Sequence, residues 1–178
     1  IDGIAGVRDN GDSVEIGAMT RQRDLMRDDV IAAKAPIIPE ALHWVGHFQT
    51  RNRGTIGGSV AMADPAAEMP ACILALGATL VVQNSAGKRE IPAEDYFLGL
   101  YETARAENEL LVEIRIPSQK PGNVSVFLEL ARRHGDFAIA GIAASGNVSG
   151  STVNDMLLVY FARADKPTIS RNATPPLN

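Results

Sequence analysis

The clearest alternation of apolar and polar positions lies in residues 110–116. A period of two residues is typical of a strand with one buried face. The segment is therefore predicted to be a strand whose apolar side faces the core, and that side carries Leu110, Val112, Ile114 and Ile116.

Turn residues between apolar runs predict two hairpins. Asn10-Gly11 fits a two-residue turn between Ile4–Arg8 and Ser13–Gly17, because such turns favour residues that tolerate positive φ. Residues 84–87 read Asn-Ser-Ala-Gly and separate Thr79–Gln83 from Arg89–Ile91. Each pair of runs is expected to form an antiparallel pair.

Three segments have the apolar spacing or the caps of helices. The first is predicted over residues 20–34, with Thr20 as its cap and Asp28 able to restart it. The second is predicted over residues 36–47, where apolar residues share one face. The third is predicted over residues 66–76 and ends at a glycine.

The pattern breaks at residues 118–123, which contain Pro-Gly-Asn. The predicted fold class is α+β, with a mixed lobe over residues 1–117 and a small antiparallel sheet within 118–178. The polar tail, residues 166–178, is expected to be loosely ordered. The strands predicted beyond the break are Val124–Arg132, Ala138–Val148 and Val153–Ala162.

Composition excludes several classes of function. The chain of 178 residues has 17 basic and 21 acidic side chains and a net charge of −4, so it lacks the basic footprint of a protein that binds nucleic acid or an anionic membrane. The single cysteine, Cys72, excludes an intrachain disulfide, a Cys-based zinc site and an iron–sulfur cluster held by this chain alone. No signal peptide is recognised, and a cytoplasmic location is expected.

The glycine-rich segment 55–68 is the strongest candidate for chemistry. Gly57-Gly58 would let the backbone approach a bulky ligand, and consecutive backbone N–H groups form an anion-accepting concavity. The carboxylates of Asp64 and Glu68 can accept hydrogen bonds from sugar or ribityl hydroxyls. The alternative is a simple tight turn, with Asp64 capping the third helix.

Other candidates have structural interpretations that we favour. His43 and His47 have the spacing of metal ligands on one helix, but no third ligand is near them in the sequence. Tyr96, Phe97 and Tyr101 are expected to fill the core. Cys72 is likewise expected to be a core residue. Arg51 and its basic neighbours fit either a contact with phosphate or a partner, or a solvated surface.

Residues 51–78 carry a motif that resembles a known family. The chain is similar to the FAD-binding (medium) subunit of molybdenum hydroxylases, such as carbon monoxide dehydrogenase and xanthine-dehydrogenase-like enzymes. Further matches occur at residues 16–20, 110–117 and 132–138. The matching motifs are Arg-Asn-Arg-Gly-Thr-Ile-Gly-Gly-Ser at 51–59, Asp64-Pro65, Glu68-Met69-Pro70 and Leu74-Ala75-Leu76-Gly77-Ala78.

The resemblance implies an FAD-binding lobe of the p-cresol methylhydroxylase type. Three positions depart from the family: Ser59 replaces the usual Asn, Glu68 replaces a common Asp, and Phe137 stands where relatives place Tyr beside the flavin. No catalytic acid, base or metal ligand is implied in this chain. The implied cofactor-binding residues are Thr55, Ile56, Gly57, Gly58, Ser59, Asp64, Glu68, Ile116 and Phe137.

The resemblance also implies function and partners. Substrate would be oxidised at a molybdenum–pterin centre in a large subunit, and two-iron clusters in a small subunit would pass electrons through FAD to an external acceptor. The family's N-terminal subdomain, whose Ala-Gly-Gly loop holds the pyrophosphate, and its C-terminal helical segment are expected outside residues 1–178. The alternatives are a truncated scaffold without FAD and a stand-alone flavin oxidoreductase.

Overall fold

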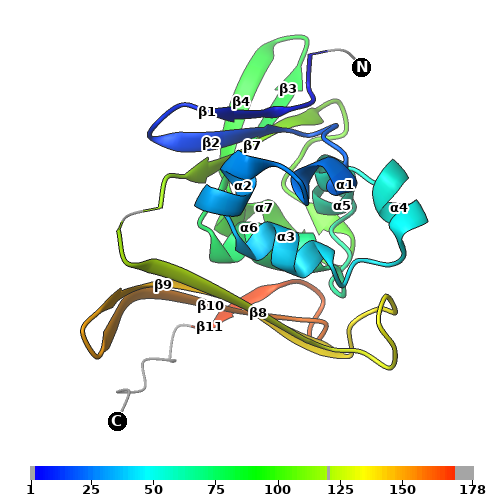
Figure 1. The fold of residues 1–178 in the computed structure, drawn as a ribbon. Helices are drawn as coiled ribbons and strands as arrows, with labels where there is room; N and C mark the ends of the chain where they lie inside the picture. The colour runs from blue at the N-terminus through cyan, green and yellow to red at the C-terminus, as the bar shows by residue number, and fades with distance from the viewer. Residues whose placement is uncertain (1–2, 120, 171–178) are drawn as a thin grey trace.

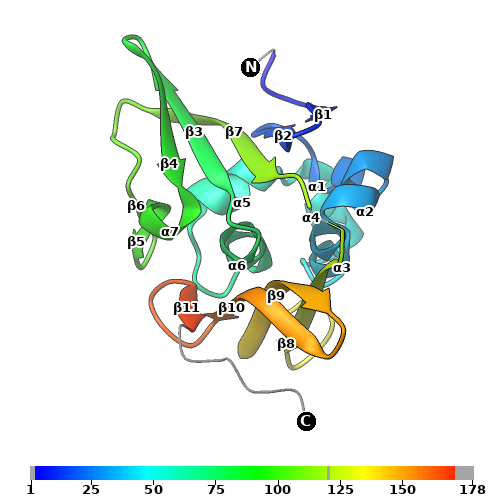
Figure 2. The ribbon, with the colours of Figure 1, turned by 90° about the vertical axis from the view of Figure 1, so that its left-hand side faces the viewer.

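A layer of short helices lies between two antiparallel sheets in the computed structural model (Figure 1). The structure describes residues 3–119 and 121–170. Its mixture of helices and antiparallel sheets confirms the predicted α+β class. Figure 2 shows the layer of helices from the side, between the two sheets. The described chain starts near one sheet and ends in the other.

The five-stranded sheet has the order β1-β2-β7-β3-β4. Its inner face packs on the helices, and Ile16, Leu80 and Ile114 there have no exposed surface. Its outer face is charged: Arg115 lies within 2.8 Å of Glu113 and forms further ion pairs with Glu15 and Glu90 on two other strands of the sheet. The strands are β1 Val7–Asp9, β2 Ser13–Gly17, β3 Thr79–Asn84, β4 Gly87–Pro92 and β7 Leu110–Pro117.

Both predicted hairpins of this sheet are confirmed, with one shift in position. The Asn10 N–H donates to the Ser13 carbonyl at 2.9 Å, so the first turn encloses Gly11 and Asp12 rather than Asn10 and Gly11. Gly11 has φ +81°, a conformation that glycine adopts at little cost. The position of the turn is therefore set by the glycine, which is its first central residue.

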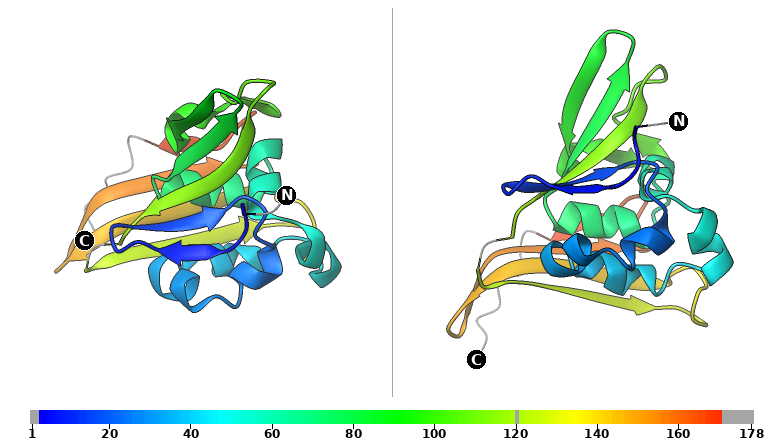
Figure 3. Two further views of the ribbon diagram at one scale, coloured as in Figure 1. Left: turned by 90° about the horizontal axis from the view of Figure 1, so that it is seen from above. Right: turned by 45° about the horizontal axis from the view of Figure 1, so that its top comes forward.

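The four-stranded sheet has the order β11-β10-β9-β8 (Figure 3). The strands predicted in this region are confirmed within a few residues. Phe127 and Phe161 lie on its buried face with ring centroids 5.5 Å apart. A short last strand lies in the tail expected to be loose, so that expectation was wrong there, and residues 171–178 lie outside the described residues. The strands are β8 Asn123–Leu130, β9 Ala140–Ser149, β10 Thr152–Phe161 and β11 Thr168–Ser170.

The helix α6, Glu68–Ala75, lies at the centre of the molecule and is buried along its whole length. It contacts β9 and β10 on one side and α3 on another, and Gly77, at φ +60°, follows its end as predicted. Cys72 is buried in it. The other helices are α1 Gln22–Leu25, α2 Asp29–Lys34, α3 Ile37–Leu42, α4 Phe48–Arg53, α5 Ile56–Met62 and α7 Ala93–Tyr96.

Two predicted helices are shorter than expected. The predicted helix 20–34 is divided into α1 and α2, and Thr20 is not a cap: its hydroxyl bonds to the backbone of Gly6 and Gly17 instead. The predicted helix 36–47 ends at Leu42. His43 and His47 therefore do not lie on one helix.

The restart of the helix at Asp28 is confirmed. Its carboxylate accepts hydrogen bonds from the N–H groups of Val30 and Ile31, both at 3.0 Å. Asp28→Ala is expected to lower the free energy of unfolding by about 1 kcal/mol, as measured by urea denaturation. Asp28→Asn, which keeps a side-chain acceptor, should lose much less. Equal losses for the two variants would contradict the capping role.

A two-stranded sheet extends beside α7 and consists of β5 Phe97–Gly99 and β6 Glu102–Thr103. Tyr96 and Phe97 are buried and pack edge to face, as predicted. Tyr101 is the exception: it is 53% exposed and has a left-handed backbone with φ +56°. Its expected place in the core was wrong.

Residues 118–122 connect the two large sheets, since β7 and β8 belong to different ones. Buried residues of both sheets nevertheless form one cluster around α6. The division into lobes at 1–117 and 118–178 therefore stays a prediction. Among the described residues, no helix has the length and apolar character needed to cross a membrane.

Candidate functional site

A cleft of about 340 Å³ lies where segments from both sides of residues 118–122 meet. It is within the usual volume range of small-molecule sites, about 300–1,000 Å³. The structure brings Ser59, Asp64, Glu68 and Phe137 together in its lining. These residues come from α5, the α5–α6 connection, the start of α6 and the turn after β8. Their convergence makes this cleft the candidate site.

Asp64 is held in a fixed orientation. One oxygen, Oδ1, accepts a hydrogen bond from the Ala66 N–H at 2.9 Å, and the other, Oδ2, accepts one from the Tyr101 hydroxyl at 3.4 Å. The N-cap residue of α6 is Ala67, so the alternative in which Asp64 caps this helix was wrong. Asp64 instead shapes the turn before the helix and lies in the cleft lining.

Glu68 is the most deeply buried acid of the cleft, with 7% of its surface exposed. Its own backbone N–H lowers the pKa of this carboxyl, but burial has the larger effect. Burial raises the pKa of Glu68 to about 7, and the negative charges of Glu129 and Asp64 act in the same direction. The carboxyl is therefore able to gain or lose a proton near neutral pH.

Glu129, on the inward side of β8, is a second acid with a raised pKa, although it is not part of the cleft lining. Its two carboxyl oxygens are buried and have no hydrogen-bond partner among the described residues. Burial raises the pKa of Glu129 to about 7. A buried carboxyl without a donor favours its neutral form, because the charge would lose its hydration.

The glycine-rich segment is helical, which corrects the expectation of a loop. Gly57 and Gly58 lie in α5, and neither has positive φ. Thr55 is the N-cap, and its hydroxyl accepts from the Gly58 N–H at 3.0 Å. The Ile56 and Gly57 N–H groups donate to the carbonyls of Thr20 and Ala18. The expected concavity of free amides was therefore wrong.

The two glycines have different surroundings. Gly57 is buried against Ala18, and a Cβ there would lie 2.6 Å from the Ala18 carbonyl oxygen. Gly58 is exposed, and a Cβ there would meet only the Thr55 hydroxyl, at 2.9 Å. The lack of a side chain at Gly57 thus lets α5 pack closely against the segment after β2. At Gly58 it leaves backbone exposed beside Ser59.

Two of the predicted cofactor residues lie in the core. Ile56 and Ile116 have no exposed surface, and neither belongs to the cleft lining. Thr55 is partly exposed at the start of α5 but is also outside this lining. A direct cofactor contact by these three residues stays a prediction.

Sequence reasoning missed half of the cleft wall. Val45 and Gly46 precede α4, Thr50 lies in it, and Gly135 and Asp136 form the turn before Phe137. Gly46 and Gly135 both have positive φ, +46° and +86°. The glycine in each segment was the available signal of a backbone with positive φ. Nothing in the sequence indicated that the two segments lie next to each other.

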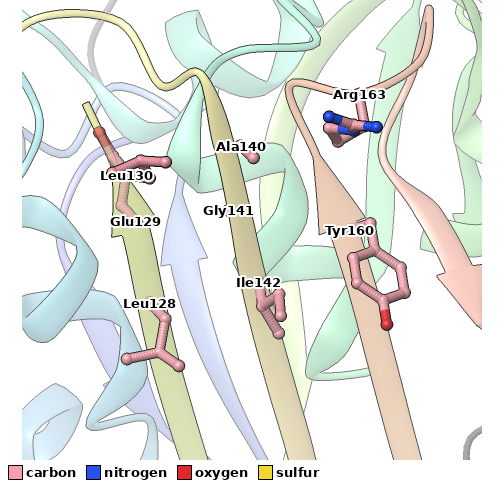
Figure 4. A pocket seen from close by; sticks show the side chains of 8 residues that line it. All are labelled: Leu128, Glu129, Leu130, Ala140, Gly141, Ile142, Tyr160 and Arg163. Carbon is pink, nitrogen blue, oxygen red and sulfur yellow. The ribbon is translucent and has the colours of Figure 1, made fainter. Parts of the chain in front are cut away.

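A larger hollow, of about 390 Å³, lies on the opposite side of β8 from the core. Leu128, Ile142 and Tyr160 are cross-strand neighbours on that face, and Figure 4 shows their side chains together with Arg163 at one end. None of the predicted site residues lines it. Its lining is mainly apolar, which makes it a weaker candidate for a site that must orient a cofactor by hydrogen bonds.

Among residues 3–119 and 121–170, no group of three or more His, Cys, Asp or Glu side chains is arranged to hold a metal ion. His43 and His47 flank the loop between α3 and α4. We assign no metal role to either.

Residues 1–119 match the family described as the FAD binding domain in molybdopterin dehydrogenase. The chain belongs to this family of FAD-binding domains. The carbon monoxide dehydrogenase medium chain of Hydrogenophaga pseudoflava is 40% identical over 85% of this chain. The glyceraldehyde dehydrogenase medium chain of Sulfolobus acidocaldarius is 36% identical over 90% of it. The chain spans only 53% and 57% of these relatives' lengths.

Solved structures agree with the assignment to the FAD-binding domain family. Carbon monoxide dehydrogenase from Hydrogenophaga pseudoflava, in a form that lacks the Mo-pyranopterin moiety, superposes with a TM-score of 0.92 at 38% identity. Quinoline 2-oxidoreductase from Pseudomonas putida 86 superposes with a TM-score of 0.90 at 34% identity. The match covers 94% and 96% of this chain, and 58% and 59% of theirs.

The chemistry of the cleft fits part of an FAD molecule. Carboxylates at Asp64 and Glu68 repel a pyrophosphate but accept hydrogen bonds from ribityl hydroxyls and from the ring N–H. Glu68 has no acceptor role toward another side chain in the described residues, so it is available to such donors. The ring of Phe137, 73% exposed, offers a flat apolar surface for stacking.

Proposed function

We propose that this chain is part of the FAD-binding subunit of a molybdenum hydroxylase. In this proposal, two-iron clusters on a small subunit deliver electrons to FAD, and FAD passes them to an external acceptor. The organic substrate is oxidised at a molybdenum–pterin centre on a large subunit. A cytoplasmic location and a lobe of the p-cresol methylhydroxylase type belong to the same proposal.

The convergence of Ser59, Asp64, Glu68 and Phe137 in one cleft carries this proposal. When bound, the flavin supplies the redox chemistry. Asp64 and Glu68 would accept hydrogen bonds from the ribityl chain, and Phe137 would cover one face of the ring system. The chain's contribution is to bind and orient the cofactor and to set the charge around it.

The experiment is reconstitution of the complete subunit with FAD. A yellow protein with flavin absorption bands and a stoichiometric flavin content is expected. A colourless protein that folds but takes up no FAD would contradict the proposal and support the truncated-scaffold alternative.

Asp64→Ala in the complete subunit is expected to weaken FAD binding by about 1–3 kcal/mol, the usual loss for a charged hydrogen-bonding partner. Flavin content and the dissociation constant are measured beside the thermal midpoint. Asp64→Asn is the matched control, since it keeps the acceptor for the Ala66 N–H and should lose less affinity. If Asp64→Ala loses stability but retains all its flavin, Asp64 only shapes the turn.

A further inference from the structure

We propose that Arg51 is a positioning residue, which holds the wall of the cleft that carries Phe137. Arg51 lies in α4 and is not itself in the cleft lining. It acts through the loop before α4 and the turn after β8, which contact each other. That the ligand is FAD rests on the proposed function, whereas the contacts of Arg51 are independent of it.

The Arg51 guanidinium fixes the loop between α3 and α4. Its Nη1 donates to the carbonyl of Val45 at 2.7 Å and to that of Gly46 at 2.9 Å. Hydrogen bonds from a charged donor are stronger than those between neutral groups. Gly46 has φ +46°, so the loop depends on glycine at the place where Arg51 holds it.

The turn after β8 rests on that same carbonyl. A Cβ on Gly135 would lie 2.8 Å from the Gly46 oxygen and 3.3 Å from His47 Cε1. Gly135 also has φ +86°, where other residues are strained. The two backbones therefore approach so closely that only glycine fits, and the Gly46 carbonyl contacts both Arg51 and the turn.

A ring contact beside this junction joins the same two segments. Trp44 and His134 stack with centroids 5.5 Å apart and an interplanar angle of 28°. Phe137 follows in the same turn and is 73% exposed. Because little surrounds its side chain, its position depends on the backbone of the turn, and that backbone is seated on the loop held by Arg51.

This role differs from those considered for Arg51 from the sequence, which were a contact with phosphate or a partner, or a solvated surface. Arg53 provides the contrast within the same helix. It is exposed, and its side chain has no hydrogen bond or ion pair among the described residues. Arg53→Met is therefore a matched control for Arg51→Met.

A double-mutant cycle on FAD affinity in the complete subunit tests the inference. Arg51→Met and Phe137→Ala are each expected to raise the dissociation constant about tenfold. If Arg51 acts through the turn, the double variant should lose about tenfold as well, because residues that act through one another are not additive. Arg53→Met should bind FAD as the parent does.

Trp44 emission gives a second readout that needs no ligand and no large change in the core. His134→Ala, at an exposed position, should change the emission of Trp44 in the parent subunit. The same substitution in the Arg51→Met background should change it much less, because the ring contact is already loosened.

A hundredfold rise of the dissociation constant in the double variant would overturn the inference. So would an Arg51→Met variant whose thermal midpoint falls while its FAD affinity is unchanged. An undiminished effect of His134→Ala on Trp44 in the Arg51→Met background would overturn it too. A parent subunit that does not bind FAD would instead refute the proposed function. In that case the Trp44 comparison still decides the positioning role. If Arg51→Met lowers the folding yield, the same comparison is made with Arg51→Lys.

Discussion

Gly57→Ala is expected to destabilise the protein by at least about 3 kcal/mol, at the upper end of losses from overpacking. The added methyl group would lie 2.6 Å from the carbonyl oxygen and 2.7 Å from the Cα of Ala18. Backbone atoms cannot rotate away as a flexible side chain does. The Gly57 N–H also donates to that carbonyl at 2.9 Å, so separating α5 from Ala18 would stretch this hydrogen bond as well.

Gly58→Ala is the matched control, one residue along the same helix. Its methyl group would meet only the Thr55 hydroxyl, and replacing glycine by alanine within a helix usually gains about 0.5–1 kcal/mol. Urea denaturation of both variants should show a large loss for Gly57→Ala and a change within about 1 kcal/mol for Gly58→Ala. Similar losses would show that the Ala18 contact does not limit the position.

The stability of the protein is expected to fall as pH rises from 5 to 8, and Glu68 and Glu129, whose pKa values are both raised to about 7, should account for much of the change. The pKa of the Glu68 carboxyl is raised to about 7 in the folded protein from an ordinary value of 4.5. The folded state therefore holds the proton more tightly. The contribution is fully present below about pH 4.5 and is lost as pH rises through 7, on the order of 3 kcal/mol.

Glu68→Gln isolates this effect. Its free energy of unfolding, relative to the parent, should rise steadily between pH 5 and 8, since glutamine cannot ionise. Glu107→Gln, at an exposed carboxyl, should run parallel to the parent over the same range. The lowered pKa values of Asp9 and Glu109 act at more acidic pH. A constant difference between Glu68→Gln and the parent would contradict the prediction.

The sheets were predictable from the sequence because their signals are local. Alternation marks β7, and turn residues mark the hairpins on either side of it. The helices α4 and α5 were missed for two different reasons. The helix α4 has little apolar periodicity and no buried residue. Gly57-Gly58 lowers the helix propensity of α5, and contact with Ala18 together with the Thr55 cap overrides that preference.

The candidate site was predictable only in part. Asp64 and Glu68 were singled out as carboxylates beside the glycine-rich segment and Phe137 by resemblance, and the structure brings the three together. The contribution of residues 45–50 was not predictable, because the loop acts through backbone carbonyls whose neighbours are set by tertiary contacts. Arg51 illustrates this: its side-chain chemistry suggests an anion, while its actual acceptors are the carbonyls of Val45 and Gly46.

The position of Phe137 has a consequence for the order of events during synthesis. Residues 45–68 leave the ribosome well before residues 135–137, and both line the cleft. The early wall has no opposite wall until β8 pairs with β9 and the sheet packs on α6. A ligand that needs both walls therefore binds only after the sheet that carries residues 135–137 has packed against the helices. By mass action such a ligand then stabilises the association of the early and late segments, so its binding favours chains in which the two walls have already packed together.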